Sequence, residues 1–249
     1  MVAVLEVSGT SASALFRADA YAQTCNARVT AVHHREDGLV AVGLDQTVFY
    51  PTGGGQPGDS GTLVVGDKTY TVQETRKGDA LGEIWHLLPV GSAAPNLGDS
   101  VEASIDWARR FAHMRFHTAL HVLCSQLDGL ATGNSIAADK ARLDYDSHGS
   151  VPDKAELEAR VNAQIAAAHA VSTVWITDEE MLARPELIKS MSVKPPMGAG
   201  QVRLLKIGEL DLQPCGGTHV ANTSEIGRIV VTKIENKGKQ NRRVHVAFA

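Results

Sequence analysis

Two short segments of the sequence carry residues that could together bind a metal ion. Cys215 and His219 are separated by two glycines and a threonine, and the glycines let the chain turn sharply enough for a thiolate and an imidazole to converge. His117 and His121 are four residues apart in a segment with helical periodicity, so their side chains lie on the same face. A set of three imidazoles and one thiolate favours zinc over harder metal ions. The spacing therefore predicts one zinc site built from both segments.

These residues leave two other interpretations open. Four protein ligands form a closed coordination shell, which is typical of a zinc ion that only stabilises the fold, whereas catalytic zinc usually keeps one open position. Cys215 could also act as a nucleophile with His219 as its base, as in cysteine hydrolases. Counting ligands does not choose among a catalytic metal, a structural metal and a cysteine nucleophile.

The composition limits the class of protein. The chain has 249 residues, of which 43% are hydrophobic, enough for a sizeable core and for two domains. A net charge of −4 provides no global positive field, so a nucleic-acid partner would have to bind a local basic patch. Three cysteines without framework spacing indicate a reducing, cytoplasmic location. The sequence contains neither a signal peptide nor an apolar run long enough for a membrane helix.

The first part of the chain, residues 1–105, reads as a small antiparallel β-barrel with its lead-in. Short β-type runs alternate with turns rich in glycine and aspartate, at intervals that favour a closed or half-closed barrel. The expected strands are Ala27–His33, Leu39–Leu44, Thr62–Val65, Thr69–Glu74, Ile84–Leu88 and Ser100–Ile105.

One loop of this predicted barrel has an unusual composition. Gly53, Gly54, Gly55 and Gln56 follow an aromatic pair, and three consecutive glycines give more freedom than a plain hairpin needs. Such a loop can bring bare backbone N–H groups close to a ligand, although a flexible surface loop has the same composition. A phosphate-binding P-loop is excluded, because no Gly-Lys-Ser/Thr follows.

The second part, residues 106–249, reads as helices on a mostly antiparallel sheet, which makes the whole chain α+β. Asp106 is a good N-cap for a helix from Trp107 to Leu127. His113 continues the histidine stripe of this helix and could be a further ligand, but four ligands are already present, which favours a structural residue or a support for the metal ligands. Arg109 and Arg110, in the first turn, could contact an anion. A turn is predicted at residues 129–134 and a loop at 189–201. The remaining helices are predicted at 150–170 and 177–184. The strands are predicted at 140–146, 171–176, 202–207, 226–235 and 243–248.

The C-terminal hairpin is the basic patch of the sequence. Between Gly227 and Arg243 there is a single acid, Glu235, against six lysines and arginines: Arg228, Lys233, Lys237, Lys239, Arg242 and Arg243. A phosphate backbone could dock on such a surface. Lysines that protect the edge of a sheet would produce the same pattern.

Three segments together carry a resemblance to a known family. Residues 109–123, which include both helical histidines, and residues 215–227, which begin Cys-Gly-Gly-Thr-His, resemble the editing domain of alanyl-tRNA synthetases. Residues 45–59, with the glycine-rich loop, resemble the barrel that precedes that domain. Since no aminoacylation module is present in the chain, it is most similar to the free-standing alanyl-tRNA editing proteins of the AlaX type, in their medium-length form. The family pattern often ends in Gly-x-Arg-Arg-Ile/Val, and the chain departs from it here, because Lys239-Gln-Asn precedes Arg242-Arg243.

The resemblance implies a function and assigns residues to it. It implies hydrolysis in trans of tRNA(Ala) mischarged with serine, and also with glycine, at a zinc ion held by His117, His121, Cys215 and His219. It assigns the loop Gly53, Gly54, Gly55 and Gln56 to the editing pocket, where Gln56 or a polar residue of Thr132–Ser135 would read the serine hydroxyl. Arg109, Arg110, Lys239, Arg242 and Arg243 are expected to contact tRNA. The rival function is a non-catalytic RNA-binding module with a structural zinc.

Overall fold

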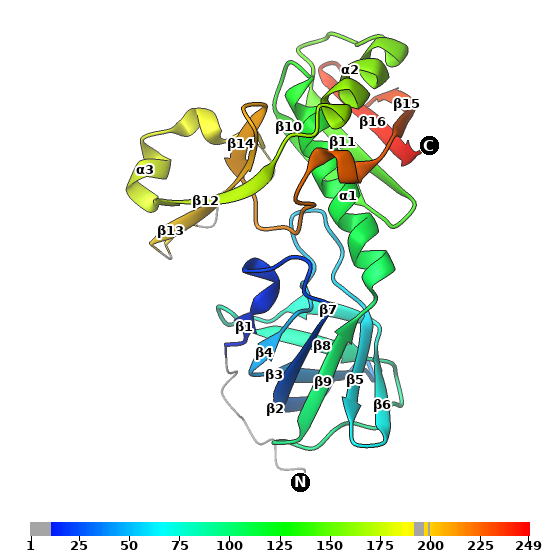
Figure 1. Cartoon of the computed structure of the whole chain (residues 1–249), viewed down its shortest axis with the longest axis vertical. Helices are drawn as coiled ribbons and strands as arrows, with labels where there is room; N and C mark the ends of the chain where they lie inside the picture. The colour runs from blue at the N-terminus through cyan, green and yellow to red at the C-terminus, as the bar shows by residue number, and fades with distance from the viewer. Residues whose placement is uncertain (1–10, 192–196, 199) are drawn as a thin grey trace. The chain divides into compact units, whose positions relative to one another are not determined.

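A computed structural model of the chain describes residues 11–191, 197–198 and 200–249. It is an α+β structure in which strands predominate (Figure 1). The chain divides into two compact units, one of residues 1–52 and 57–110 and the other of residues 53–56 and 111–249. The first four residues of the long helix thus belong to the first unit, and the tip of the glycine-rich loop belongs to the second. None of the described helices has the length and hydropathy required to cross a bilayer.

The first unit is a curved, barrel-like sheet of seven strands in the order β6-β5-β9-β2-β3-β8-β7, with antiparallel neighbours throughout. These strands are β2 (Thr24–His34), β3 (Val40–Leu44), β5 (Gly61–Val65), β6 (Lys68–Val72), β7 (Glu74–Lys77), β8 (Ile84–Leu88) and β9 (Ser100–Ile105). The short strands β1 (Ser13–Ala14) and β4 (Gln46–Thr47) pair in parallel, and η1 (Leu15–Arg17) follows β1. The alternating inward residues of the strands form its core, as expected for a sheet that curves around its own apolar face.

The first unit contains a buried ion pair between Arg110 and Asp59. The guanidinium of Arg110 is fully buried and contacts both carboxylate oxygens of Asp59. It also donates to the carbonyls of Val48 and Ala20, while Tyr50 N donates to Asp59. Because each ion has several partners, the charges are buried without leaving either one unpaired. The sequence-based prediction that Arg110 contacts tRNA is therefore corrected: this side chain is structural.

The second unit contains the long helix and two sheets. Strands β10 (Ala131–Ile136), β11 (Lys140–Asp146), β16 (Asn241–Phe248) and β15 (Ile229–Asn236) form a four-stranded sheet in that order, and β12 (Val171–Thr177), β13 (Gln201–Ile207) and β14 (Asp211–Pro214) form a three-stranded sheet. Helix α1 (Trp107–Ser125) packs on the four-stranded sheet, where Phe116 stacks on Phe248 with ring centroids 3.8 Å apart. The remaining elements are α2 (Lys154–Ala166), α3 (Asp178–Leu182), η2 (Pro185–Leu187) and η3 (Thr223–Ile226).

The described elements agree with most of the sequence-based predictions, and the differences have clear causes. Asp106 accepts a hydrogen bond from Arg109 N, and Thr177 forms the predicted capping box with Glu180. Residues 129–134 were predicted as a turn, but β10 begins at Ala131, because its pairing with β11 outweighs the weak strand propensity of Gly133 and Asn134. The short strand β14 was not predicted, because its buried residues, Asp211 and Gln213, are polar and its last residue is a proline. Residues 192–196 and 199 of the predicted loop lie outside the described residues.

Candidate metal centre

The four predicted ligands converge in the second unit. One ligand atom from each of His117, His121, Cys215 and His219 lies within 4.8 Å of the others. The thiol Sγ of Cys215 is 3.2 Å from His219 Nε2 and 3.6 Å from His117 Nε2. A tetrahedral zinc ion with ordinary Zn–N and Zn–S bond lengths separates its ligand atoms by about 3.4 to 3.6 Å. The residues therefore fit a tetrahedral metal ion in number, chemistry and spacing.

Each imidazole is held by a hydrogen bond on the ring nitrogen that faces away from the cluster. His117 Nδ1 donates to Gln56 Oε1 at 2.8 Å, and His121 Nδ1 to Asp211 Oδ2 at 3.1 Å. His219 Nδ1 lies 3.2 Å from the hydroxyl of Thr118, which already donates to a helix carbonyl and must therefore accept from the ring. With each Nδ1 acting as donor, the Nε2 atoms are directed toward the cluster, as the imidazole ligands of a metal require.

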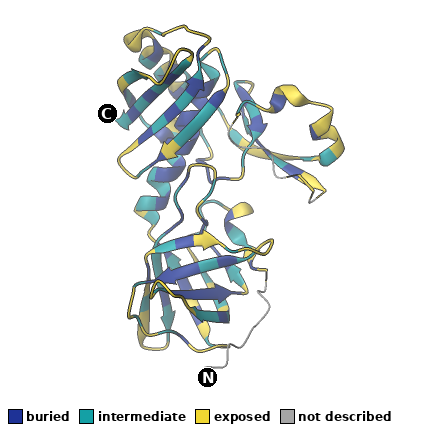
Figure 2. Ribbon diagram, turned by 180° about the vertical axis from the view of Figure 1, so that it is seen from behind, coloured by how far each residue is buried: buried dark blue, intermediate teal, exposed yellow. Residues whose placement is uncertain are grey.

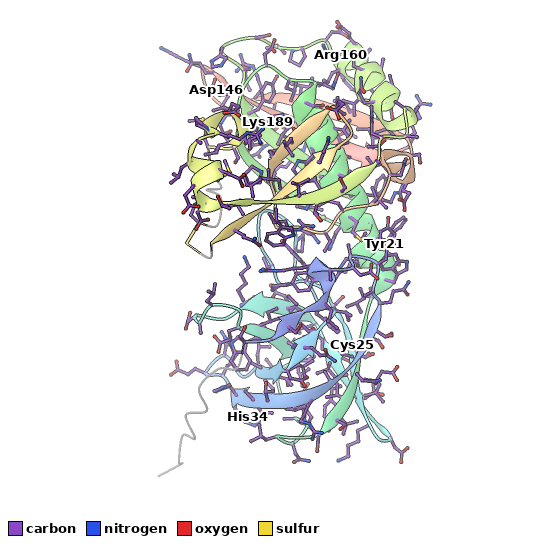
Figure 3. The ribbon with its side chains drawn as sticks, turned by 60° about the vertical axis from the view of Figure 1, so that its left-hand side comes forward. Tyr21, Cys25, His34, Asp146, Arg160 and Lys189 are labelled. Carbon is purple, nitrogen blue, oxygen red and sulfur yellow. The ribbon has the colours of Figure 1, made fainter. Side chains whose placement is uncertain are left out.

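Two further side chains hold Asp211 in place. Lys189 Nζ is 2.6 Å from Asp211 Oδ1, and Gln213 Nε2 donates to Oδ2 at 2.7 Å (Lys189 is labelled in Figure 3). Burial alone would raise the pKa of the Asp211 carboxyl, but these contacts and that of His121 outweigh it and lower the pKa to about 2. Asp211 is therefore a carboxylate at neutral pH, in which form it can fix the His121 ring.

The protonation of the ligands follows from their proximity. Burial raises the pKa of the Cys215 thiol, but the imidazoles of His117, His219 and His121 outweigh this effect and bring it well below its ordinary value of 9.0. Burial lowers the pKa of His219 to about 3, so this ring is neutral. For His121, burial lowers the pKa, but Cys215 and Asp211 dominate and raise it to about 10. A thiolate and neutral imidazoles are the forms that bind metal, and binding would displace the proton from His121.

Gly217 lets the metal-binding turn approach the helix. A Cβ atom at this position would lie 2.2 Å from His117 Cε1 and 3.0 Å from Gln56 Oε1. At the preceding Gly216, an added Cβ would meet nothing within 4 Å. Of the two glycines between the Cys215 and His219 ligands, Gly217 is therefore the one that the packing requires.

The glycine-rich loop forms a tight hairpin that supports the cluster. Gly53 and Gln56 exchange backbone hydrogen bonds, and the central residues Gly54 and Gly55 both have positive φ, as in a two-residue type I′ turn. The expectation of more freedom than a plain hairpin needs is therefore wrong: the glycines are what this turn requires. Gln56 is fully buried, and its amide contacts His117 and both the hydroxyl and the backbone N of Thr218. This places Gln56 behind a ligand rather than on an open surface.

The residues predicted to contact tRNA differ in accessibility. Arg242 is buried and donates to backbone carbonyls that include Gly238 and Gly149, so, as for Arg110, its predicted tRNA contact is corrected to a structural role. Arg243 makes a two-pronged ion pair with Asp144, and Arg109 donates to a carbonyl of the first unit. Lys239 is exposed and takes part in no ion pair within the described part of the chain. Of the three hairpin residues predicted to contact tRNA, Arg242 is thus buried and Arg243 is paired with an acid, whereas Lys239 is accessible.

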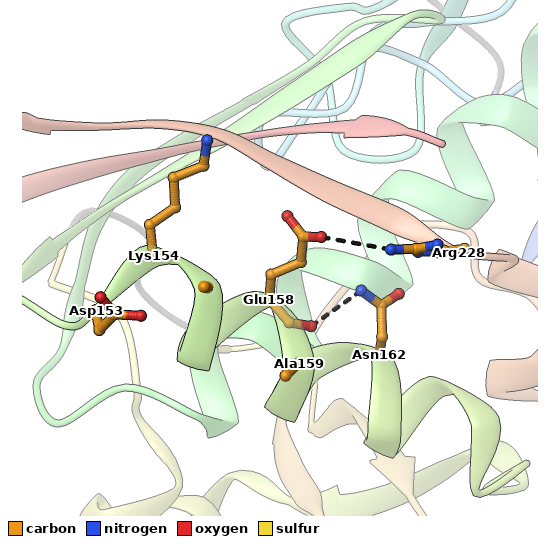
Figure 4. A pocket seen from close by; sticks show the side chains of 7 residues that line it. Asp153, Lys154, Glu158, Ala159, Asn162 and Arg228 are labelled. Carbon is orange, nitrogen blue, oxygen red and sulfur yellow. Dashed lines mark hydrogen bonds and ion pairs between the residues drawn. The ribbon is translucent and has the colours of Figure 1, made fainter.

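A polar hollow beside α2 lies outside the candidate centre (Figure 4). Asn162 donates to the carbonyl of Ile229 and accepts from its N–H, and Glu158 accepts from Val231 N. These backbone groups belong to β15, an edge strand of the four-stranded sheet. The polar side chains of the hollow therefore form hydrogen bonds with backbone groups at a sheet edge that would otherwise lack partners, which is a structural role.

Several residues of the centre were not identified from the sequence. Thr118 lies between the two helical histidines, and Asp211 lies four residues before Cys215, but a single threonine or aspartate is too common to suggest a role. Lys189 is far from both segments in the sequence. Only the fold brings these supports together.

Comparisons with known proteins connect this centre to tRNA synthetases and editing proteins. Residues 202–245 match the threonyl and alanyl tRNA synthetase second additional domain, and residues 11–109 match class II (A) tRNA synthetases. The chain is 38% identical over 211 residues to the alanyl-tRNA editing protein AlaX-M of Methanosarcina acetivorans, an alignment that covers 81% of this chain and 86% of the relative. It is 34% identical to AlaX-L of Pyrococcus horikoshii, covering 91% and 55%, and 35% identical to the alanine–tRNA ligase of Metallosphaera sedula, covering 77% and 22%.

Proposed function

Because the chain belongs to the family of alanyl-tRNA editing proteins, we propose that it hydrolyses mischarged tRNA(Ala) at the candidate metal centre. The reaction breaks the ester between an amino acid and the 3′ ribose of the tRNA, and releases the amino acid and free tRNA. The observation that carries the proposal is the convergence of three imidazoles and a thiol on one point, with every ring fixed from behind.

The proposed cofactor is zinc, held by His117, His121, Cys215 and His219. When bound in this four-ligand shell, zinc would supply a template that orients the ester, and it would act as a Lewis acid on the ester only if one ligand gave up its position. Gln56, Asp211 and Thr118 keep the imidazoles in the tautomer that offers Nε2 inward. The cluster is least covered at Cys215 and the exposed Gly216, since the three histidines are buried. We place the ester on that side.

Serine is the proposed main substrate, and Asn134 is the residue that we propose reads its hydroxyl. The other candidate, Gln56, already uses its amide for His117 and Thr218. Asn134 Oδ1 is a buried acceptor without a hydrogen-bond partner in the described parts of the chain, and it packs against the backbone of Gly55. A serine hydroxyl could donate to this oxygen, whereas alanine has no group to do so. A site that hydrogen-bonds a hydroxyl can discriminate strongly against an analogue that lacks it.

The test is deacylation of Ser-, Gly- and Ala-tRNA(Ala) by the purified protein, with and without a chelator, together with the metal content of each sample. We expect fast hydrolysis of the seryl ester and much slower hydrolysis of the glycyl and alanyl esters, because neither of these amino acids carries a hydroxyl. Cys215→Ala should lose bound metal and deacylation together, by roughly a thousandfold or more in rate, because a metal that orients the ester is worth several kcal/mol. A metal-free Cys215→Ala protein that still deacylates Ser-tRNA(Ala) would refute the proposal.

A cysteine nucleophile is the alternative suggested by the contact between Cys215 Sγ and His219 Nε2. The surroundings favour metal binding instead, because a nucleophilic thiol needs one base, whereas three imidazoles face this one. Alkylation separates the two: a metal-loaded protein whose activity is insensitive to iodoacetamide excludes the nucleophile, and stoichiometric inactivation without metal loss supports it.

A further inference from the structure

Trp175 lies in a row of residues that ends at the metal-binding cysteine. In the three-stranded sheet, Trp175 of β12 pairs with Arg203 of β13. Cys215 N donates to Arg203 O at 3.2 Å, which continues the β13–β14 pairing one residue beyond β14. Directly paired residues of neighbouring antiparallel strands point to the same face. Trp175, Arg203 and Cys215 therefore form one cross-strand row.

The face that carries this row is the one that supports the metal ligands. Side chains alternate along a strand, so Asp211 and Gln213 of β14 share the face of Cys215. Asp211 contacts His121, and Gln213 contacts Asp211. Trp175 is thus on the same face as these residues, at the outer edge of the sheet.

This face is covered near the histidines and open at the tryptophan. Leu205 and Ile207, which share the face, are 1% and 0% exposed, whereas Trp175 is 48% exposed. Most of β12 around Trp175 is likewise exposed, as Figure 2 shows for the outer part of the three-stranded sheet. Within the described residues, the indole of Trp175 makes no ring contact with another aromatic side chain. An exposed, rigid aromatic surface is a typical platform for an unpaired nucleobase.

Arg203 is the middle residue of the row, between Trp175 and Cys215. Its Nη1 donates to the carbonyls of Cys215 at 2.6 Å and Gly217 at 3.2 Å, which fixes the turn that carries the thiolate. Strands are spaced by about 4.8 Å, so the backbones of Trp175 and Cys215 are separated by about 10 Å. This interval is comparable to the reach of a nucleoside from its stacked base, through the ribose, to an ester on the 3′ oxygen.

We propose that Trp175 stacks on the 3′-terminal nucleobase of the aminoacyl-tRNA and so places the ester beside Cys215. The inference rests on the proposed deacylase function and adds the binding position of the terminal nucleoside. It makes Trp175 a positioning residue for substrate binding, remote from the bond that breaks. The chemical class recognised is a purine nucleoside with an acylated 3′ oxygen.

The kinetic test compares Trp175→Ala and Trp175→Phe with Val174→Ala, full-length and metal-loaded, on Ser-tRNA(Ala). Val174 is the neighbour of Trp175 on β12, points to the opposite face and is 39% exposed, so it is a matched control. Losing one base-stacking contact should raise KM roughly five- to a hundredfold in Trp175→Ala, with kcat and the melting temperature close to the wild type. Trp175→Phe should retain most of the affinity, and Val174→Ala all of it.

A second measurement reports stacking directly. When 2-aminopurine replaces the terminal adenine of tRNA(Ala), binding of the wild type and of Val174→Ala should quench its fluorescence, whereas binding of Trp175→Ala should not. Equal KM values for Trp175→Ala and Val174→Ala, or unchanged quenching, would overturn the inference. A change of oligomeric state in Trp175→Ala would do the same, because it would identify Trp175 as a protein contact. An inactive wild type would instead refute the deacylase function itself.

Discussion

Helix α1 contributes residues to two polar clusters, and the two differ in whether their polar atoms find partners within the protein. In the first unit, the guanidinium of Arg110 meets the carboxylate of Asp59 and two backbone carbonyls, so donors and acceptors match within the protein. In the second unit, a thiol and three ring nitrogens face one another. The first cluster is complete without a ligand. The second one would become complete if a cation occupied its centre, and this difference is what we expect to separate a structural cluster from a functional one.

The largest effect expected from this comparison is on the stability of the first unit. Arg110→Met leaves the buried Asp59 carboxylate without its cation and should cost about 3 to 5 kcal/mol in the free energy of unfolding, as breaking a buried ion pair does. Denaturant unfolding followed by the fluorescence of Trp85 and Trp107, which lie in this unit, measures the loss. At a temperature where the variant is folded, its metal content should equal that of the wild type. Loss of metal in folded Arg110→Met would contradict the separation of the two clusters.

The lowered pKa of one buried histidine predicts that the first unit becomes less stable as the pH falls. His86 is fully buried between the hydroxyl of Thr47 and the carbonyl of Val42, and burial lowers its pKa from 6.5 to about 4. A depressed pKa means that unfolding is accompanied by proton uptake, so this stabilisation is present above pH 6.5 and is lost as the pH falls toward 4. The loss is on the order of 3 kcal/mol. Unfolding measured at several pH values should show the slope, and His86→Gln should reduce it; an unchanged slope would contradict the assignment.

The smallest effect distinguishes the two glycines of the metal-binding turn. Gly217→Ala inserts a methyl group against His117 and should weaken metal binding by roughly ten- to a hundredfold, because overpacking costs about 1 to 3 kcal/mol. Gly216→Ala, at an open position of the same turn, should bind metal like the wild type. Competition with a chromophoric chelator gives both affinities. Equal affinities for the two variants would show that the close approach to His117 is not needed.

The convergence of the four predicted ligands could be expected from the sequence because each of the two segments carries a local pattern. His117 and His121 follow the helical repeat, and Cys215 and His219 flank a glycine turn. The same reasoning failed for Arg110, since nothing near it in the sequence shows that Asp59 will lie within hydrogen-bond distance. Burial and pairing between distant residues depend on the fold, so they cannot be read from a short segment. The type and spacing of ligands, in contrast, are visible within each segment of the sequence.

Some strands could be predicted from their own sequence, whereas others depend on contacts with distant residues. Short β-type runs such as Ile84–Leu88 and Ser100–Ile105 were predicted with their observed bounds. Strand β10, with a glycine and polar residues, is ordered by its neighbour β11 and could not be predicted from its own sequence. The role of Gln56 was also beyond local reasoning, because its contacts lie at His117 and Thr218.

Cobalt substitution tests most directly whether the second cluster holds one metal ion. Protein prepared without zinc and titrated with Co²⁺ should bind one equivalent and develop the intense visible absorption of tetrahedral cobalt, with a thiolate-to-cobalt charge-transfer band that is absent from Cys215→Ser. Zinc should displace the cobalt and abolish both bands. Weak octahedral absorption, or a charge-transfer band that persists in Cys215→Ser, would contradict a site made of three imidazoles and this thiolate.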